Sequence, residues 1–295
     1  MHRNRLRNQG LVRRAVQFSA LLATNLHLSG WVDGTIYTGG SKAFFIPGLH
    51  CYSCPSSILA CPLGSLQSLL AAPNFWGMLA TGRPDALVVL SVIGFIAFLG
   101  FLAGRFACGW ICPFGLLQDL LYRIPSPKFG FQDSLRPAKY ALLFILVLAL
   151  PAFLRPVAGG AGDPWFCKIV CPAGTSLAGW PLVSASPADF QLGFLFWWKS
   201  SIAILILLWA VTVERPFCRS LCPLGAAWGL MGRVSLFRMR VAESCISCGK
   251  CQNVCPMGIA IYREPGSSEC IRCGKCAAIC PVGAISHTVS SGEKP

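Results

Sequence analysis

The sequence contains little charge and lacks several common catalytic motifs. Only 12% of its 295 residues are Asp, Glu, Lys or Arg, whereas 54% are hydrophobic. Ordinary soluble domains have roughly 25% charged residues, so this composition argues against one. A glycine-rich phosphate loop, paired catalytic carboxylates and a Ser-His-Asp arrangement are all missing. The sequence therefore shows no sign of nucleotide binding.

Cysteine, in contrast, is abundant, with 17 residues. Two copies of Cys-x2-Cys-x2-Cys-x3-Cys-Pro begin at Cys245 and Cys270. In bacterial two-cluster ferredoxins the first three cysteines of each run bind one cubane and the fourth binds the other. Zinc sites and disulfide frameworks are the alternatives, but zinc prefers two separated cysteine pairs. We therefore predict one [4Fe–4S] cluster on Cys245, Cys248, Cys251 and Cys280, and a second on Cys270, Cys273, Cys276 and Cys255.

Four hydrophobic stretches predict transmembrane helices, because a helix needs about 20 mostly apolar residues to cross a bilayer. The predicted fold is an all-α transmembrane bundle of four helices (residues 1–240), followed by a small α+β two-cluster ferredoxin domain (residues 241–295). The four stretches are Ala15 to Trp31, Ala86 to Gly104, Tyr140 to Leu154, and Ser200 to Val213 extended by Phe194 to Trp198.

Basic residues are concentrated on one side of this predicted bundle. The net charge is +14, and 20 of the 25 Lys and Arg precede the first span, separate the second from the third, or follow the fourth. The positive-inside rule then places both termini in the cytoplasm, with the protein multi-pass in a bacterial inner membrane. Topology and contact with anionic lipid explain the charge, so nucleic acid is not an expected partner. Arg13 and Arg14 resemble a twin-arginine export signal, but no convincing small-residue cleavage site follows.

The motif Cys-Pro-x-Gly organises the region before the ferredoxin domain. It occurs at Cys61, Cys112, Cys171 and Cys222, and both the first two and the last two copies are 51 residues apart. This spacing indicates a parallel repeat of two-helix units, at about residues 11–125 and 137–235. The repeat assigns the remaining nine cysteines to the two ends of the bundle.

Four cysteines are expected together at the cytoplasmic ends of the second and fourth spans. The i, i+4 spacing within each pair predicts that both sulfurs lie on one helical face. Repeat symmetry then supplies four thiolates, enough for a further cubane or a tetrahedral metal. The alternative is small buried side chains packing between helices. These inner cysteines are Cys108, Cys112, Cys218 and Cys222.

Five cysteines are expected on the outer side, and four of them are enough for another cluster. The apolar stretch from Ser57 to Ala72 is predicted to dip into the membrane as a re-entrant segment, which brings this cluster toward the inner one. Disulfides in an oxidising compartment are the rival interpretation. The choice between Cys51 and Cys54 as the fourth ligand is open. The outer cysteines are Cys51, Cys54, Cys61, Cys167 and Cys171.

Together these motifs resemble the NapH and MauN membrane ferredoxin family, and they are similar to the membrane part of NosR and to CcoG, also called RdxA. The resemblance extends over about residues 11–287. It implies an electron-transfer subunit of a larger complex, which exchanges electrons with the quinone pool or an outer-side partner and with a cytoplasmic redox protein. The outer cysteines depart from the NapH pattern, which leaves the direction of flow open and favours a longer electron path with centres near both faces.

Two further interpretations concern individual features. Similarity to CcoG suggests an alternative function in copper reduction, assembly or redox sensing for a partner oxidase. A copper route predicts outer loops rich in Met or His, yet residues 31–85 contain only Met78 and His50.

Asp119 is expected to face the cytoplasm or to pair with Arg123 at i+4. Acceptance of a quinol proton is its alternative role.

Overall fold

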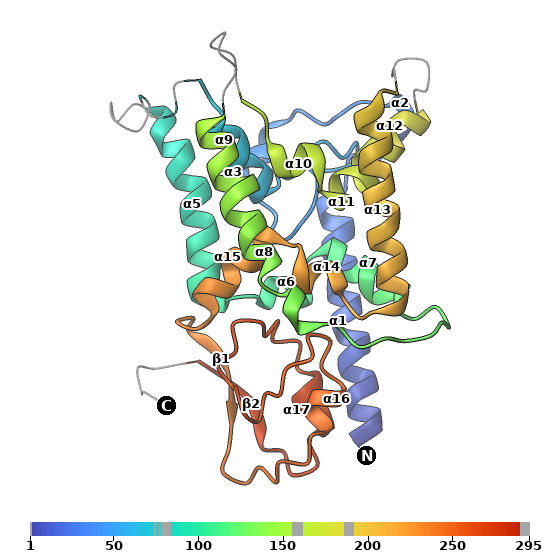
Figure 1. Cartoon of the computed structure of the whole chain (residues 1–295), viewed down its shortest axis with the longest axis vertical. Helices are drawn as coiled ribbons and strands as arrows, with labels where there is room; N and C mark the ends of the chain where they lie inside the picture. Colours follow the sequence, from blue (N-terminus) through green and yellow to red (C-terminus); the bar gives the residue numbers. More distant parts are fainter. Residues whose placement is uncertain are drawn as a thin grey trace.

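The computed structural model describes residues 2–73, 75, 77, 84–154, 162–185 and 192–289 of the chain. Long helices stand side by side, and the ferredoxin region lies against one end of them (Figure 1). The start of the first helix and the last strand lie at this same end (Figure 1). We call it the ferredoxin end, and the opposite one the outer end.

Three long helical segments make up most of the bundle. They are α5 (Pro84–Ala103), a continuous segment made of α8 (Ala138–Leu142), η3 (Leu143–Ala149) and α9 (Leu150–Phe153), and α13 (Phe194–Thr212). The middle part of the second segment, η3, is π-helical. It precedes Pro151, which has no N–H to donate to the carbonyl four residues earlier.

Among the described residues, two helical stretches are long and apolar enough to cross a membrane. They are Asp133–Phe153, with 21 residues, and Phe194–Thr212, with 19. In α5, the stretch Leu87–Ala103 is apolar but shorter than these two. Only two of the four predicted spans therefore pass both criteria, and the four-helix transmembrane bundle is not confirmed.

The first predicted span, Ala15 to Trp31, has the wrong bounds. The helix α1 runs instead over His2–Thr24 and includes the arginine-rich segment. Arginine is a good helix former, so this segment continues the helix instead of flanking it. α1 packs on the ferredoxin helix α17 and on α6 and α7 of the bundle. It therefore links the two parts of the molecule.

Each Cys-Pro-x-Gly motif starts a short helix. The cysteine is the N-cap and the proline is the first helical residue, where its missing N–H costs nothing and its fixed φ suits the helix. These helices are α3 (Pro62–Leu70), α7 (Pro113–Leu121), α11 (Pro172–Gly174) and α15 (Pro223–Gly232).

The last three of these helices each follow another short helix, which carries the preceding cysteine. These are α6 (Phe106–Trp110), α10 (Trp165–Ile169) and α14 (Pro216–Ser220). The prediction that Cys108 and Cys112 share one helical face is therefore wrong, and so is the same prediction for Cys218 and Cys222. A proline follows the second cysteine of each pair and disfavours a helical conformation at that cysteine. The helix that carries the first cysteine therefore ends before the second is reached. The sulfurs instead meet at the junction of two short helices.

The ferredoxin region consists of an antiparallel two-stranded sheet and two short helices. Strand β1 (Phe237–Val241) pairs with β2 (Ile285–Val289), with Phe237 opposite Val289. The helices are α16 (Lys250–Asn253) and α17 (Lys275–Ile279). Their N-caps, Gly249 and Gly274, have φ values of 71° and 75°, a left-handed conformation that favours glycine. The remaining short elements are α2 (Gly30–Asp33), η1 (Gly40–Ala43), η2 (Asp133–Leu135), η4 (Thr175–Gly179) and α12 (Trp180–Ala185).

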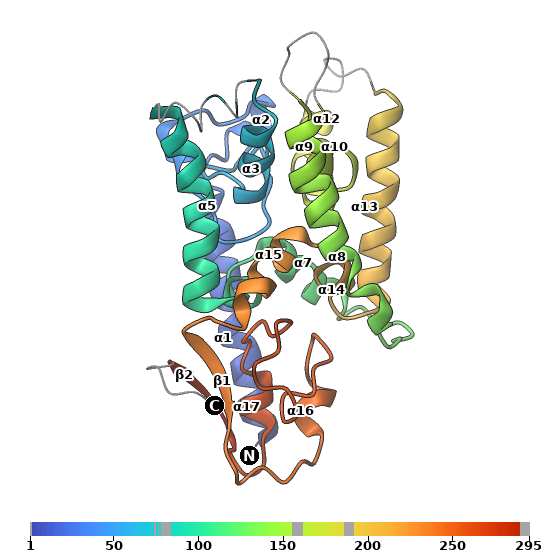
Figure 2. The same ribbon diagram turned by 60° about the vertical axis from the view of Figure 1, so that its left-hand side comes forward.

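One hydrophobic core continues from the bundle into the ferredoxin region. It includes Phe166 near the outer end, Trp228 in α15, and Ile271 and Cys273 between the two ferredoxin helices. Figure 2 shows the ferredoxin region directly against α15 and α1. The ferredoxin region is thus packed on the bundle through buried side chains, and this contact positions its cysteines relative to those of the bundle.

Candidate iron–sulfur sites

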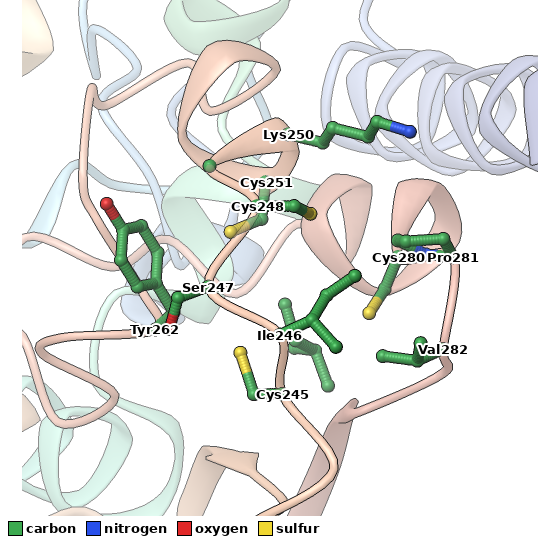
Figure 3. Close-up of a pocket in the computed structure, with 12 residues that line it drawn as sticks. Cys245, Ile246, Ser247, Cys248, Lys250, Cys251, Tyr262, Cys280, Pro281 and Val282 are labelled. Atoms are coloured by element: carbon green, nitrogen blue, oxygen red, sulfur yellow. The ribbon is translucent and has the colours of Figure 1, made fainter.

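The first ferredoxin pocket brings together the four cysteines predicted to share a cluster. Three come from the first run, and the fourth precedes Pro281 at the end of the second run. Figure 3 shows their side chains around a common space, with Ile246 and Tyr262 beside it. The space between the lining atoms is about 300 Å³. The four cysteines are Cys245, Cys248, Cys251 and Cys280.

The second ferredoxin pocket contains the other predicted set. Its space is about 360 Å³, and Met257, Ile259 and Ile271 are among the side chains that line it. Burial raises the pKa of the Cys270 thiol to about 12. This thiol therefore stays protonated at neutral pH unless a nearby metal stabilises the thiolate. The four cysteines are Cys255, Cys270, Cys273 and Cys276.

The inner pocket is formed by the four cysteines at the junctions α6–α7 and α14–α15. Its space is about 290 Å³, close to the volumes of the two ferredoxin pockets. Its walls are mostly apolar and include Leu49 and the two phenylalanines Phe114 and Phe217, whose ring centres are 5.1 Å apart. A pocket of this size and donor set fits the same cubane. The cysteines are Cys108, Cys112, Cys218 and Cys222, each 5–6% exposed.

Two buried arginines lie beside the inner pocket in equivalent positions. Arg105 Nη2 donates to the carbonyl oxygen of Cys218 at 2.8 Å, and Arg105 Nη1 pairs with Glu269 at 2.6 Å. Arg215 Nη1 donates to the carbonyl oxygen of Cys108 at 2.9 Å. These guanidinium groups place positive charge next to four potential thiolates, which favours the ionised form.

Asp119 pairs with Arg215 rather than with Arg123, so that prediction is wrong. Its two carboxylate oxygens accept from Nε and Nη2 of Arg215, both at 2.7 Å, and Arg13 Nη2 donates at 2.8 Å. Asp119 is 9% exposed and does not face solvent. The helices α1 and α14 approach α7 in the tertiary structure, and the local i, i+4 spacing could not reveal these partners.

The outer cysteines divide into a group of four and a separate residue. An added Cβ at Gly174 would lie 3.7 Å from Cys51 Sγ and 3.8 Å from Cys171 Sγ, and one at Gly64 would lie 3.7 Å from Cys61 Cβ and 3.8 Å from Cys167 Sγ. The two glycines therefore leave space beside these sulfurs. The structure thus brings together Cys51, Cys61, Cys167 and Cys171.

Cys54 has different neighbours. Its Sγ lies 3.3 Å from Ser56 Oγ and 3.6 Å from Asn25 Oδ1. All 17 cysteines lie in the described part of the chain, and all are free thiols there. No group of three His, Cys, Asp or Glu side chains in that part is arranged to hold a single metal ion. The ligands of a cubane lie farther apart, because each of them binds a different iron.

One loop segment contacts both the inner and the outer cysteines. The backbone N–H of Leu49 donates to Cys112 Sγ at 3.3 Å in the inner pocket. The backbone of the next residue, His50, lies close to the outer Cys61, and the following residue is Cys51 itself. A single peptide unit therefore separates the contacts to the two cysteine groups.

Two buried glutamines were missed by the analysis of the sequence. The side-chain amide of Gln67 donates to Cys167 Sγ, and that of Gln118 donates to Cys218 Sγ. They are 51 residues apart, each six positions after the cysteine of a Cys-Pro-x-Gly motif. An alignment of the Cys61 and Cys112 motifs, extended to the residues that follow them, would have identified them.

Comparisons with known proteins agree with the assignment of cysteine groups to [4Fe–4S] binding. Residues 85–132, 195–241 and 276–294 match the family model of a 4Fe-4S binding domain, and residues 238–281 match that of a 4Fe-4S dicluster domain. The ferredoxin-type protein NapH of Haemophilus influenzae is 28% identical over 182 residues, and the methylamine utilization ferredoxin-type protein MauN of Methylorubrum extorquens is 30% identical over 199 residues. The chain belongs to the NapH/MauN-type ferredoxin-like family. The predicted resemblance and the predicted [4Fe–4S] cofactors are thereby confirmed.

The extent of these matches differs between relatives. The NapH match covers 59% of this chain and 55% of NapH, and the MauN match covers 67% and 60%. YccM of Escherichia coli is 27% identical over 276 residues, which is 88% of this chain and 69% of YccM. The chain therefore spans less than two thirds of NapH and MauN. No solved structure is significantly similar to it. This NapH/MauN-type chain is an iron–sulfur protein.

Proposed function

We propose that this NapH/MauN-type protein carries electrons through a membrane along four [4Fe–4S] clusters. The observation that carries the proposal is the succession of four cysteine groups inside one packed molecule. The two ferredoxin pockets adjoin each other, the inner pocket lies at the base of the bundle, and the outer group lies on α3, α10 and α11 toward the outer end (Figure 1).

The protein groups around each proposed cluster have a simple chemical task. A [4Fe–4S] cluster accepts and releases one electron when it is bound. The chain supplies four thiolates, apolar walls that exclude water, and N–H donors that stabilise negative charge on sulfur. In the inner pocket these donors include the amides of Leu49 and Gly225, which lie 3.3 Å from Cys112 Sγ and Cys222 Sγ respectively. Electron transfer then requires little rearrangement.

Close contacts between neighbouring groups support a continuous path. The Leu49–His50 peptide lies between the inner and outer cysteines. At the other side of the inner pocket, an added Cβ at Gly109 would lie only 2.4 Å from the carbonyl oxygen of Ile271. Gly109 follows Cys108, and Ile271 follows Cys270. The lack of a side chain at Gly109 thus allows the second ferredoxin pocket to approach the inner pocket.

Several features support a membrane location. A hydrocarbon core is about 30 Å thick, so clusters at its two faces must lie within the bundle if electrons are to pass. The long helices expose large apolar side chains, such as Phe98 at 63%, Leu205 at 65% and Leu208 at 59%. Exposed apolar surface of this kind suits lipid. With most basic residues at the ferredoxin end, the positive-inside rule places that end in the cytoplasm.

The partners follow from the resemblance to NapH. The quinone pool or an outer-side redox protein exchanges electrons with the bundle, and a cytoplasmic redox protein exchanges them with the ferredoxin region. The protein works as a subunit of a larger complex in the bacterial inner membrane. The direction of flow depends on the relative potentials of these partners.

Counting iron and acid-labile sulfide in anaerobically purified protein tests the proposal. Four cubanes require about 16 irons per chain. Replacing Cys108 and Cys222 together by serine should lower the count to about 12 and leave the ferredoxin clusters intact. About eight irons in the wild type, unchanged by this double substitution, would confine the clusters to the ferredoxin region and overturn the proposal.

A further inference from the structure

Two glutamines donate hydrogen bonds to the sulfurs of the bundle cysteines. Gln67 Nε2 lies 3.2 Å from Cys167 Sγ, and Gln118 Nε2 lies 3.0 Å from Cys218 Sγ. Both side chains are completely buried. Burial of an amide in an apolar core is costly unless the amide is hydrogen-bonded, so these two positions do not serve packing alone.

The two glutamines occupy equivalent positions after the two Cys-Pro-x-Gly motifs of the first half. Each lies six residues after the cysteine of its motif in the first half, and each reaches the first cysteine of a pair in the second half, 100 residues later. The corresponding positions in the second half are Leu177 and Trp228. Trp228 donates to the carbonyl oxygen of Ile96, not to a sulfur. The outer and inner groups therefore each receive one glutamine.

Other contacts hold the glutamine amides in place. Gln67 Nε2 also donates to the carbonyl oxygen of Leu63 at 3.2 Å, and its Oε1 accepts from the backbone N–H of Phe166 at 2.9 Å. Gln118 Nε2 also donates to the carbonyl oxygen of Phe114 at 3.3 Å. Each donor is thus oriented before any charge change on the sulfur, as electrostatic stabilisation requires.

We propose that Gln67 and Gln118 set the reduction potentials of the outer and inner clusters. This inference rests on the proposed presence of those clusters. Reduction adds one electron to a cluster and increases the negative charge on its sulfurs, and no bond is broken. A hydrogen bond donated to a ligand sulfur stabilises the reduced state and raises the potential. The two glutamines act on the clusters through the cysteines and are positioning residues.

Redox titrations of the intact protein, followed by electron paramagnetic resonance, test this proposal. Methionine is similar to glutamine in length and has no donor. Gln118→Met should lower the potential of the inner cluster alone, and Gln67→Met that of the outer cluster alone. A lost hydrogen bond of ordinary strength should change the ratio of reduced to oxidised cluster about tenfold, which is about 59 mV for one electron. Gln132→Met, at an exposed position, is the matched control.

The outcomes separate this inference from the proposed function. About 16 irons with unshifted potentials in both variants would overturn the role of the glutamines and leave the clusters in place. About eight irons in the wild type would instead show that the bundle holds no clusters, and would overturn the proposed function. If a methionine variant loses iron, the inference is tested on wild-type protein labelled with ¹⁵N in the glutamine side chain. Its reduced bundle clusters should show a ¹⁵N hyperfine coupling, and absence of that coupling would overturn the inference.

Discussion

Arg215 donates a hydrogen bond of 2.9 Å to the carbonyl oxygen of Cys108, a residue in the other half of the repeat. The relationship is reciprocal, since Arg105 in the first half donates to the carbonyl oxygen of Cys218 in the second at 2.8 Å. Each half of the repeat therefore positions a cysteine of the other half. The inner pocket is complete only when both halves are folded against each other.

Both arginines belong to buried ion-pair networks that need their carboxylates. Arg215 and Arg13 share Asp119, and Arg105 and Lys139 share Glu269. Removal of one partner from such a network leaves uncompensated buried charge, which is far more costly than loss of a surface pair. The two carboxylates are therefore good targets for separating the stability of the bundle from the docking of the ferredoxin region.

Asp119→Asn should destabilise the bundle by about 3–5 kcal/mol, because Arg215 and Arg13 lose their common buried partner. Thermal unfolding of the detergent-solubilised protein measures this change. The matched control is Asp133→Asn, whose side chain is 69% exposed in its pair with Arg136. It should cost less than about 1 kcal/mol. Equal effects of the two substitutions would contradict the importance of the buried network.

Glu269→Gln should weaken the docking of the ferredoxin region on the bundle. Burial raises the pKa of Glu269, but Arg105 and Lys139 outweigh this effect and hold the pKa below its ordinary value. The carboxylate is therefore charged at neutral pH, and its contribution to stability is lost only as the pH falls below the ordinary glutamate range. Hydrogen exchange at pH 7 should show faster exchange in residues 269–273 of the variant.

Glu264→Gln provides the control for this experiment, because Glu264 is exposed and lies in the same loop. Its exchange should match the wild type. Unchanged exchange in Glu269→Gln would show that the apolar contacts between the two parts hold the ferredoxin region without the ion pair.

Cys51→Ser and Cys54→Ser should have different effects on iron content. Cys51 lies with Cys171 beside Gly174, whereas Cys54 contacts Ser56 and Asn25. Cys51→Ser should therefore lose about four irons, and Cys54→Ser should keep them all. The reverse result would exchange the roles of these two cysteines, and no loss in either variant would argue against an outer cluster.

Reporter fusions test the orientation in the membrane. A reporter that is active only in the cytoplasm should work when fused after Pro295 and should be inactive when inserted near Asp163. The reason is the positive-inside rule, applied to the basic residues of the ferredoxin end. Activity at Asp163 and none after Pro295 would place the ferredoxin region on the outer side of the membrane.

Local spacing by itself determined the ferredoxin region and its cofactor. Each run of cysteines is short enough to wrap one cubane, and Cys280 follows its run at the distance that lets it reach the other pocket. The repeat of Cys-Pro-x-Gly motifs, spaced 51 residues apart within each half, likewise indicated which bundle cysteines correspond to one another. Both inferences depend on covalent spacing along the chain, which the sequence records directly.

Only the tertiary structure decided which distant groups meet. Helical spacing suggested Arg123 for Asp119, yet the partners are Arg215 and Arg13, brought to α7 by α14 and α1. The division between Cys51 and Cys54 also depends on contacts with α11 and the end of α1. Packing of short helices around their proline breaks sets these contacts, and hydrophobic periodicity carries no information about which buried polar groups face each other.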